Sequence, residues 1–250
     1  MSEIYKALRK ISEKKSLEDQ AHLKTPGLVS VCMPNYNKQK YIKEAILSIS
    51  KQTYPHIELV IVDDKSTDES RSIIHEAITK LQLSIPVRTL FLPKRCGTAW
   101  AQNMAYYLSS GEYIANMDSD DVSDPNRIQE QVMAMKNNNY DLVGTNFSIF
   151  SEDTAKPLVE NGGSWLLYDS EEIADSYMFK LTHCVCFGTL MFKSSLIDKI
   201  GGMNKKFIGT EDFEIVDRAI SQGAHAGNLN QILYHYRENP SQRSRLFHGS

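Results

Sequence analysis

Acidic side chains crowd the stretch YIANMDSDDVSDP at residues 113–125. Asp118, Asp120 and Asp121 lie within four residues, directly after an apolar run that is typical of a buried strand. A solvent-facing turn needs only one or two Asp or Asn side chains. Carboxylate oxygens are the ligands that Mg²⁺ and Mn²⁺ prefer, and such ions take much of their remaining coordination from substrate phosphates and water. The pattern therefore favours a metal–diphosphate site over a solvated turn that caps a helix beginning near Pro125.

Two further polar clusters follow apolar runs of the same kind, PNYN at 34–37 and DDKS at 63–66. From residue 28, short apolar runs alternate with amphipathic segments. This alternation predicts an α/β fold in which right-handed βαβ crossovers build a central, mostly parallel sheet with helices on both faces. Ligands of such sheets bind beyond the carboxyl ends of the strands. We therefore expect the three polar clusters to meet at one edge of the sheet.

The same periodicity places the elements along the chain. It predicts strands at 28–33, 57–62, 87–92, 113–117, 141–150 and 184–192, and helices at 41–50, 98–109 and 211–221. Ser66 and Glu69 have the spacing of a capping box, which predicts that a further helix opens there. TPG at 25–27 predicts a linker between a helical N-terminal extension, residues 1–26, and one main domain, residues 27–250.

Composition excludes several classes of protein. The net charge of −3 argues against nucleic-acid binding, which needs a basic surface. No apolar run approaches the roughly 18 residues of a membrane span, and the N-terminus lacks the apolar core of a secretory signal. The four cysteines form no CxxC pair, and Cys184 and Cys186 alone are weak evidence for zinc. We expect reduced thiols and a cytoplasmic protein, whose narrow N-terminal apolar stripe could contact a partner or the inner face of the membrane.

Three stretches, at 29–70, 97–121 and 201–223, together carry a family resemblance. Each motif is modest alone, but their order and spacing are specific, and they resemble the family 2 glycosyltransferases with the GT-A fold, of the bacterial surface-polysaccharide type. The resemblance implies a hexosyl- or N-acetylhexosaminyl-transferase. Such an enzyme moves a sugar with inversion from a nucleotide-sugar donor, usually UDP-linked, to a glycan or lipid-linked acceptor.

For the nucleotide, the resemblance implies a pocket at the ends of the strands. Pro34 and Tyr36 would line it, Asp64 would accept a hydrogen bond from the base, and Asp118 would contact the ribose. An imide proton suits a carboxylate acceptor, so Asp64 would favour uridine. The structural alternatives are that Asp64 only begins a turn and that Tyr36 is a packed aromatic ring.

For the metal and the chemistry, the resemblance implies four positions. Asp120 would bind Mn²⁺ or Mg²⁺ on the diphosphate, and His235 would add a ligand, as a histidine after a similar apolar run does in the chondroitin-polymerase-like members. Arg237 could instead neutralise the diphosphate, a task that its fork of donors suits. Asp212 of TEDFE would be the general base. A carboxylate at a helix start also gains about 0.3–1 kcal/mol from the helix dipole, which is compatible with that role.

The chain also departs from the family pattern. Gln102 stands where many members have Arg, and Arg95–Cys96 replaces a common Asn-containing turn, so the nucleotide and sugar stay open. The segment 151–186 matches least, and its Trp165, Tyr168 and His183 could stack on a sugar or pack in the core.

Two other functions remain open. A nucleotidyltransferase that makes nucleotide-sugars would need a Gly-rich basic loop after the first strand, and PNYNKQK contains no Gly. A catalytically silent binding module with the same fold would need no general base, whereas this chain retains one together with the other acids.

Overall fold

The computed structural model describes residues 24–81, 83–151, 157–159 and 163–238. Within these ranges the strands form one sheet in the order β3-β2-β1-β4-β8-β6-β9-β5, with β7 paired to β6. The strands are β1 (Thr25–Asn35), β2 (Ile57–Asp63), β3 (Val87–Phe91), β4 (Gly111–Asn116), β5 (Val122–Ser123), β6 (Leu142–Ser151), β7 (Pro157–Val159), β8 (Met191–Lys193) and β9 (Ala226–Glu238). β3, β2, β1 and β4 run parallel, and β6 and β9 form a second parallel pair.

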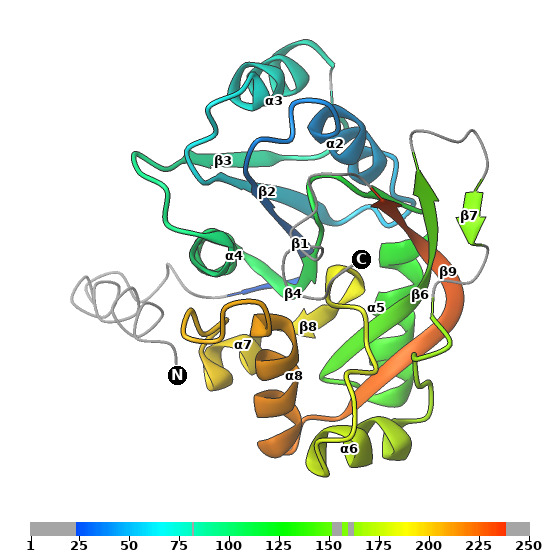
Figure 1. Ribbon diagram of the computed structural model, residues 1–250. Coiled ribbons are helices and arrows are strands. Elements are labelled where there is room, and N and C mark those ends of the chain that lie inside the picture. The colour runs from blue at the N-terminus through cyan, green and yellow to red at the C-terminus, as the bar shows by residue number, and fades with distance from the viewer. Residues whose placement is uncertain (1–23, 82, 152–156, 160–162, 239–250) are drawn as a thin grey trace, which may run out of the picture.

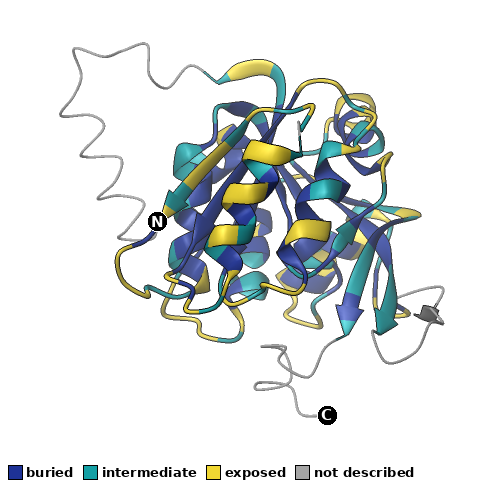
Figure 2. Cartoon of the chain, turned by 90° about the horizontal axis from the view of Figure 1, so that it is seen from above, coloured by how far each residue is buried: buried dark blue, intermediate teal, exposed yellow. Residues whose placement is uncertain are grey.

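Helices cover both faces of the sheet, as predicted, and each face has its own hydrophobic cluster (Figure 1). One face is covered by α2 (Ile42–Ser50), α3 (Ser70–Lys80) and α5 (Arg127–Asn138). The other is covered by α4 (Thr98–Leu108), α6 (Ser170–Met178), α7 (Ser194–Ile200) and α8 (Glu211–Ser221). All residues of β2 are buried, which is why its sequence is almost continuously apolar. Figure 2 shows the buried strands between helices whose outer sides are exposed.

Two of the sequence predictions on the N-terminal side are wrong in detail. The linker predicted at 25–27 is the start of β1, because Thr25 pairs with Gly111 of β4. Residues 1–23 lie outside the described ranges, so the predicted helical extension and the division at residue 26 stay predictions. The predicted capping box does not form either. α3 begins at Ser70, and the Ser66 hydroxyl instead donates to Asp63 at 2.5 Å, since that buried carboxylate is the stronger acceptor.

The C-terminal half shows the larger differences. The strand predicted over 184–192 is mostly a loop with a short 3₁₀ turn, η1 (Phe187–Thr189), and β8 begins only at Met191. The Thr189 hydroxyl donates to the Cys186 carbonyl at 2.8 Å and holds this turn. The strand at 141–150 and the helix at 211–221 are confirmed as β6 and α8. The periodicity missed β9 altogether, because its polar centre interrupts the apolar alternation.

Candidate active site

The three polar clusters meet where the parallel strands end, as the sequence predicts. The side-chain amide of Asn35, the last residue of β1, donates to Asp63 at the end of β2 at 2.9 Å. Lys38, in the loop that follows β1, places its ammonium 2.6 Å from an oxygen of Asp120, in the turn after β4. The carboxyl ends of β1, β2 and β4 therefore share one polar site.

Burial and mutual repulsion define the electrostatics of the acidic turn. Burial, and then the charge of Asp120, raises the pKa of Asp118 from 3.8 to about 6. Lys38 and Arg127 oppose this shift, whereas Asp212 adds to it. Asp212 from α8 therefore lies within electrostatic reach of Asp118, although the two are far apart in sequence. A bound cation would relieve the repulsion among these carboxylates.

Asp121, the third acid of the turn, has a structural role. It is almost fully buried, and its oxygens accept hydrogen bonds from the Tyr234 hydroxyl at 2.8 Å and from the Arg237 backbone N–H at 2.7 Å. Burial, followed by the neighbouring Asp120 and Asp118, raises its pKa well above the ordinary value. The Tyr234 hydroxyl also accepts a hydrogen bond from the Asp118 backbone N–H at 3.2 Å, so residues of β9 hold the turn in place.

The cations Lys38 and Arg127 oppose the negative charge of the acidic turn. The fully buried Arg127 donates to the Asn116 carbonyl at 2.5 Å, and burial lowers its pKa to about 10. The sequence also allows Arg237 as a diphosphate ligand. Its guanidinium instead donates to Glu44 at 2.5 Å and to the backbone carbonyl of Asp120 at 2.8 Å. Arg237 therefore stabilises the backbone of the turn.

Asp64 and Tyr36 lie together at the loop between β3 and α4. The Asp64 carboxylate accepts the backbone N–H groups of Cys96 at 2.6 Å and Gly97 at 2.8 Å. These two bonds leave lone pairs, because a carboxylate has roughly four acceptor positions. The Arg95 guanidinium stacks over the Tyr36 ring at 4.1 Å. Pro34 is in register with Val62 of β2. The bond to the Ser66 backbone N–H comes from Asp63 and not from Asp64, so Asp64 does more than begin that turn. Its base-binding role stays a prediction.

The donor chemistry of the turn fits a divalent cation that arrives with a diphosphate. Among the described residues, no group of three or more His, Cys, Asp and Glu side chains is arranged to hold a metal alone. Mg²⁺ commonly takes only one or two protein carboxylates and completes its shell with phosphate and water. The Asp120 carboxylate could be such a ligand. His235 lies on β9 opposite Val122, and its Nδ1 is 2.7 Å from the Ser148 hydroxyl. Burial lowers the pKa of His235, which favours the neutral imidazole that metals bind.

Asp212 occupies the first turn of α8. Its side chain is 42% exposed, so an incoming hydroxyl can reach it. One oxygen accepts the Phe213 backbone N–H at 2.8 Å, and the other lies 3.8 Å from Nε2 of His183. The carboxylate lies at the N-terminal end of the helix. The arrangement suits a general base.

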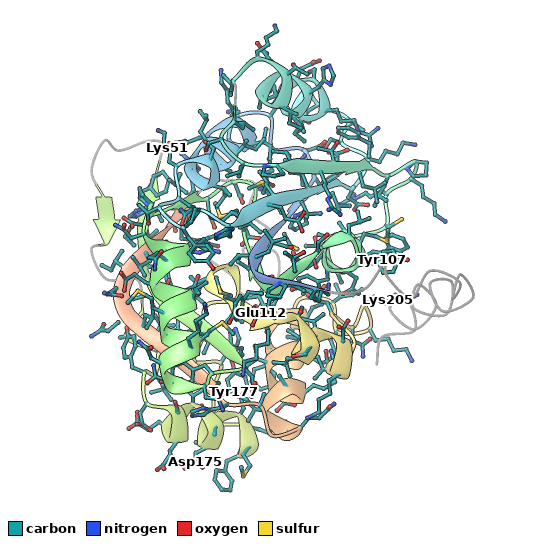
Figure 3. The ribbon with its side chains drawn as sticks, turned by 180° about the vertical axis from the view of Figure 1, so that it is seen from behind. Lys51, Tyr107, Glu112, Asp175, Tyr177 and Lys205 are labelled. Atoms are coloured by element: carbon teal, nitrogen blue, oxygen red, sulfur yellow. The ribbon has the colours of Figure 1, made fainter. Side chains whose placement is uncertain are left out.

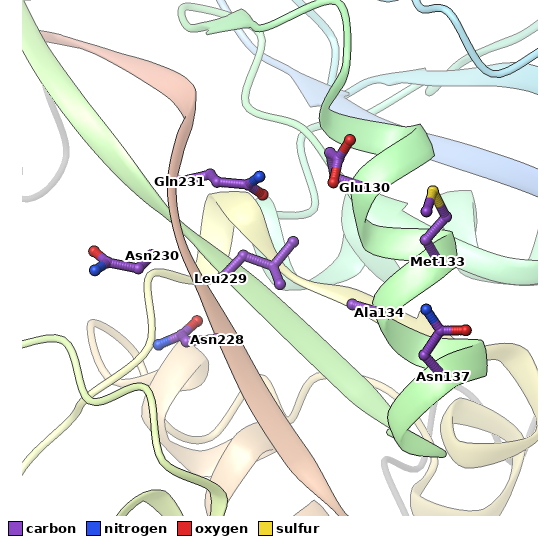
Figure 4. A pocket seen from close by; sticks show the side chains of 8 residues that line it. All are labelled: Glu130, Met133, Ala134, Asn137, Asn228, Leu229, Asn230 and Gln231. Atoms are coloured by element: carbon purple, nitrogen blue, oxygen red, sulfur yellow. The ribbon is translucent and has the colours of Figure 1, made fainter.

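A separate hollow of about 580 Å³ lies between α5 and the polar centre of β9 (Figure 4). Its walls come from Glu130, Met133, Ala134, Asn137, Asn228, Leu229, Asn230 and Gln231. None of the site residues predicted from the sequence lines it. The hollow is therefore distinct from the acidic turn and its chemistry.

The sheet order, the helices on both faces and the acidic turn after β4 define the GT-A class of α/β proteins. A family model described as "Glycosyl transferase family 2" matches residues 30–201, more than half of the chain. The chain belongs to glycosyltransferase family 2. Among the described residues, no helix is long and apolar enough to cross a membrane.

Named relatives and solved structures agree with this assignment. The chain is 37% identical to glycosyltransferase GlyG of Streptococcus pneumoniae (50% of this chain, 40% of GlyG), and 28% identical to chondroitin synthase of Escherichia coli (94% and 31%). Its fold resembles that of S. aureus TarS 1-349 in complex with UDP-GlcNAc, with a TM-score of 0.71 and 19% identity over 87% of this chain and 60% of TarS 1-349. It also resembles the mannosyltransferase PcManGT of Pyrobaculum calidifontis in complex with GDP-Man and Mn²⁺, with a TM-score of 0.63 and 19% identity over 96% of this chain and 69% of PcManGT. The chain spans less than half the length of these two curated relatives.

Proposed function

We propose that this chain is an inverting glycosyltransferase that moves a sugar from a UDP-linked donor to a glycan or lipid-linked acceptor. One observation carries the proposal: an acidic turn with a partner lysine lies within electrostatic reach of an exposed carboxylate at a helix start. The first group is suited to a nucleoside diphosphate, and the second to an acceptor hydroxyl. The solved relatives with bound UDP-GlcNAc or GDP-Man support the donor class.

Donor binding would use the strand ends. Pro34 and Tyr36 line the nucleotide, Asp64 accepts the uracil imide proton, and Asp118 accepts from the ribose. Asp120, with His235, would hold Mn²⁺ or Mg²⁺, and that ion would supply charge neutralisation to the leaving diphosphate. Lys38 is already paired with Asp120 at 2.6 Å and would turn its ammonium towards the phosphates when the carboxylate takes up the cation.

Transfer would be an in-line displacement at the anomeric carbon. Asp212 accepts the proton of the acceptor hydroxyl as its oxygen forms the new bond to the sugar. The bond between that carbon and the donor phosphate oxygen breaks, and its electron pair leaves with the nucleoside diphosphate. Attack opposite the leaving group inverts the anomeric configuration. The proton stays on Asp212 until solvent removes it.

The alternatives have less support. The loop after β1 contains no Gly to wrap a triphosphate, which counts against a nucleotidyltransferase. A silent binding module has no use for an exposed carboxylate beside the acidic turn. The free cysteines fit the cytoplasmic location that we propose. A contact of the N-terminal extension with a partner or membrane concerns residues outside the described ranges.

Thermal unfolding tests the donor site. With Mn²⁺ present, UDP should raise the melting temperature by mass action, whereas Asp120→Ala should abolish the shift. GDP and ADP serve as matched nucleotides for base preference. If no nucleotide shifts the melting temperature, the silent module becomes the better interpretation.

Turnover tests the base. A panel of nucleotide-sugars (UDP-GlcNAc, UDP-glucose, UDP-galactose and GDP-mannose) is screened for Mn²⁺-dependent release of the nucleotide, with water as acceptor. Asp212→Asn should keep the nucleotide-induced shift and lose nearly all release. Unchanged release would remove Asp212 from the mechanism.

A further inference from the structure

A buried tyrosine, a histidine and the proposed base form a line of contacts beside the site. The hydroxyl of Tyr177 on α6 lies 2.5 Å from Nδ1 of His183. On the opposite side of the same ring, Nε2 of His183 lies 3.8 Å from an oxygen of Asp212 on α8. Figure 3 places Tyr177 on the sheet side of α6, with Asp175 on the outer side of that helix. The neighbouring α6 and α8 thus approach one histidine from two directions.

The contact with Tyr177 determines which ring nitrogen carries the proton. Tyr177 is fully buried, and burial raises its pKa far above the ordinary value, so the phenol keeps its proton. With the hydroxyl assigned as the donor, Nδ1 of His183 accepts. A neutral imidazole has one N–H, which then lies on Nε2. That N–H faces the Asp212 carboxylate.

Aromatic packing holds the histidine ring in this orientation. The Trp165 ring is stacked on it at 6.1 Å with an interplanar angle of 18°. Phe213 meets it edge-on at 5.9 Å, and Tyr177 does so at the same distance. Rotation of the ring would have to displace these neighbours. The Nε2–H is therefore aimed by packing as well as by the hydrogen bond from Tyr177.

We propose that His183 is a positioning residue that orients the carboxylate of Asp212 towards the acceptor hydroxyl. The inference rests on the proposed function, since it needs Asp212 to be the base. The distance of 3.8 Å is too long for a hydrogen bond, and such contacts commonly tighten when substrate binds. Once that contact tightens, Phe213 N–H on one oxygen and His183 Nε2–H on the other would fix the plane of the carboxylate. His183 gives up no proton during transfer.

Two substitutions at position 183 separate positioning from packing. His183→Gln places an amide N–H where Nε2 lies, whereas His183→Asn places one where Nδ1 lies. We expect His183→Asn to lower kcat by about 10- to 100-fold, the cost of a base misplaced by about 1 Å, with KM for the donor unchanged. His183→Gln should recover most of that loss. Tyr177→Phe should lower kcat in the same direction, because the tautomer is no longer imposed.

The assay is Mn²⁺-dependent nucleotide release from whichever panel donor the wild type hydrolyses. His225→Ala is the matched control, because His225 packs on Tyr140 at 4.9 Å on another side of the molecule. Equal rates for His183→Gln and His183→Asn overturn the proposal, as does a loss that merely follows the melting temperature.

A second readout does not need turnover. ¹⁵N shifts of the His183 ring should report an unprotonated Nδ1 and a protonated Nε2, and Tyr177→Phe should populate the other tautomer. A proton on Nδ1 in the wild type overturns the inference even if transfer is normal. A wild type that binds no nucleotide and hydrolyses no donor would instead be a failure of the proposed function, leaving the tautomer measurement to decide the role of His183.

Discussion

Removing the hydroxyl of Tyr234 should loosen the acidic turn more than any other single-atom deletion on β9. The hydroxyl donates to the Asp121 carboxylate at 2.8 Å and accepts the Asp118 backbone N–H at 3.2 Å. Tyr234 and Asp121 are at most 1% exposed, so water cannot replace either bond without a rearrangement. Tyr234→Phe keeps the ring and removes both bonds at once.

The expected cost follows from those two partners. A hydrogen bond to a charged group contributes about 1.5–3 kcal/mol, and an orphaned buried N–H costs about 1 kcal/mol or more. We expect the free energy of unfolding to fall by about 3 kcal/mol. For a chain of this size each kcal/mol lowers the melting temperature by about 2–4 °C, which gives a decrease of about 6–12 °C. Tyr140→Phe is the control, because the Tyr140 hydroxyl has no hydrogen-bond partner within the described residues.

Urea unfolding of Tyr234→Phe, Asp121→Asn and the double variant completes a cycle. If the bond exists as described, the double variant costs little more than the worse single one, and the coupling energy exceeds about 1 kcal/mol. The UDP-induced shift should also shrink, since Asp118 is held by the same hydroxyl. Additive losses, or a melting temperature within 1–2 °C (about 0.5 kcal/mol) of the control, would refute the claim that β9 organises the turn.

Three further predictions concern the same site. Gly188→Ala should lower the free energy of unfolding by about 1–3 kcal/mol through overpacking and weaken UDP binding, because its Cβ would lie 2.9 Å from an Asp118 oxygen and from the Tyr234 hydroxyl. Thermal melting and UDP titration of the variant measure the two effects. Unaltered UDP binding would contradict the prediction. Cys96 should be the first of the cysteines at 32, 96, 184 and 186 to react with iodoacetamide, since burial raises the pKa of the other three. UDP with Mn²⁺ should slow the alkylation of Cys96, as followed by peptide mapping. An alkylation rate that UDP leaves unchanged would place the nucleotide away from Asp64. Arg237→Lys should lower the free energy of unfolding by about 2 kcal/mol, because a Lys ammonium cannot bond Glu44 and the Asp120 carbonyl with the geometry of the guanidinium. If the variant keeps full stability in urea unfolding but loses UDP binding, Arg237 instead binds the diphosphate.

The N-terminal half could be predicted because its signals are local. β1, β2 and β4 are largely buried on both faces, so their sequences are mostly apolar, and the polar residues at their carboxyl ends stand out. That contrast is enough to locate Asp64, Asp118 and Asp120 at the strand ends from the amino-acid sequence alone. The errors were confined to boundaries such as the capping of α3, where Asp63 competes for the Ser66 hydroxyl.

The C-terminal contributions could not be predicted because their reasons are long-range. Arg127 looks like an ordinary polar helix residue, yet it is fully buried beneath the turn and stacks on Tyr234 at 5.2 Å. Tyr234 lies in a strand whose polar centre conceals its periodicity. His183 lies in the segment that resembles the family least, and its partners come from α6 and α8. Nothing within a few residues of these side chains indicates what they touch.

The two halves of the chain contribute different groups to the site. The strand ends of the N-terminal half supply the groups that face a nucleotide, but β9 supplies the hydroxyl and backbone N–H that donate hydrogen bonds to Asp121. Without β9 the buried Asp121 carboxyl group would lose both of these donors, a cost of about 1–3 kcal/mol or more that would favour opening of the turn. The nucleotide half therefore cannot keep the geometry of its acidic turn alone. The strand that secures the turn pairs along its length with β6 on the far side of the sheet, so donor binding and the stability of the C-terminal half are coupled through Asp121.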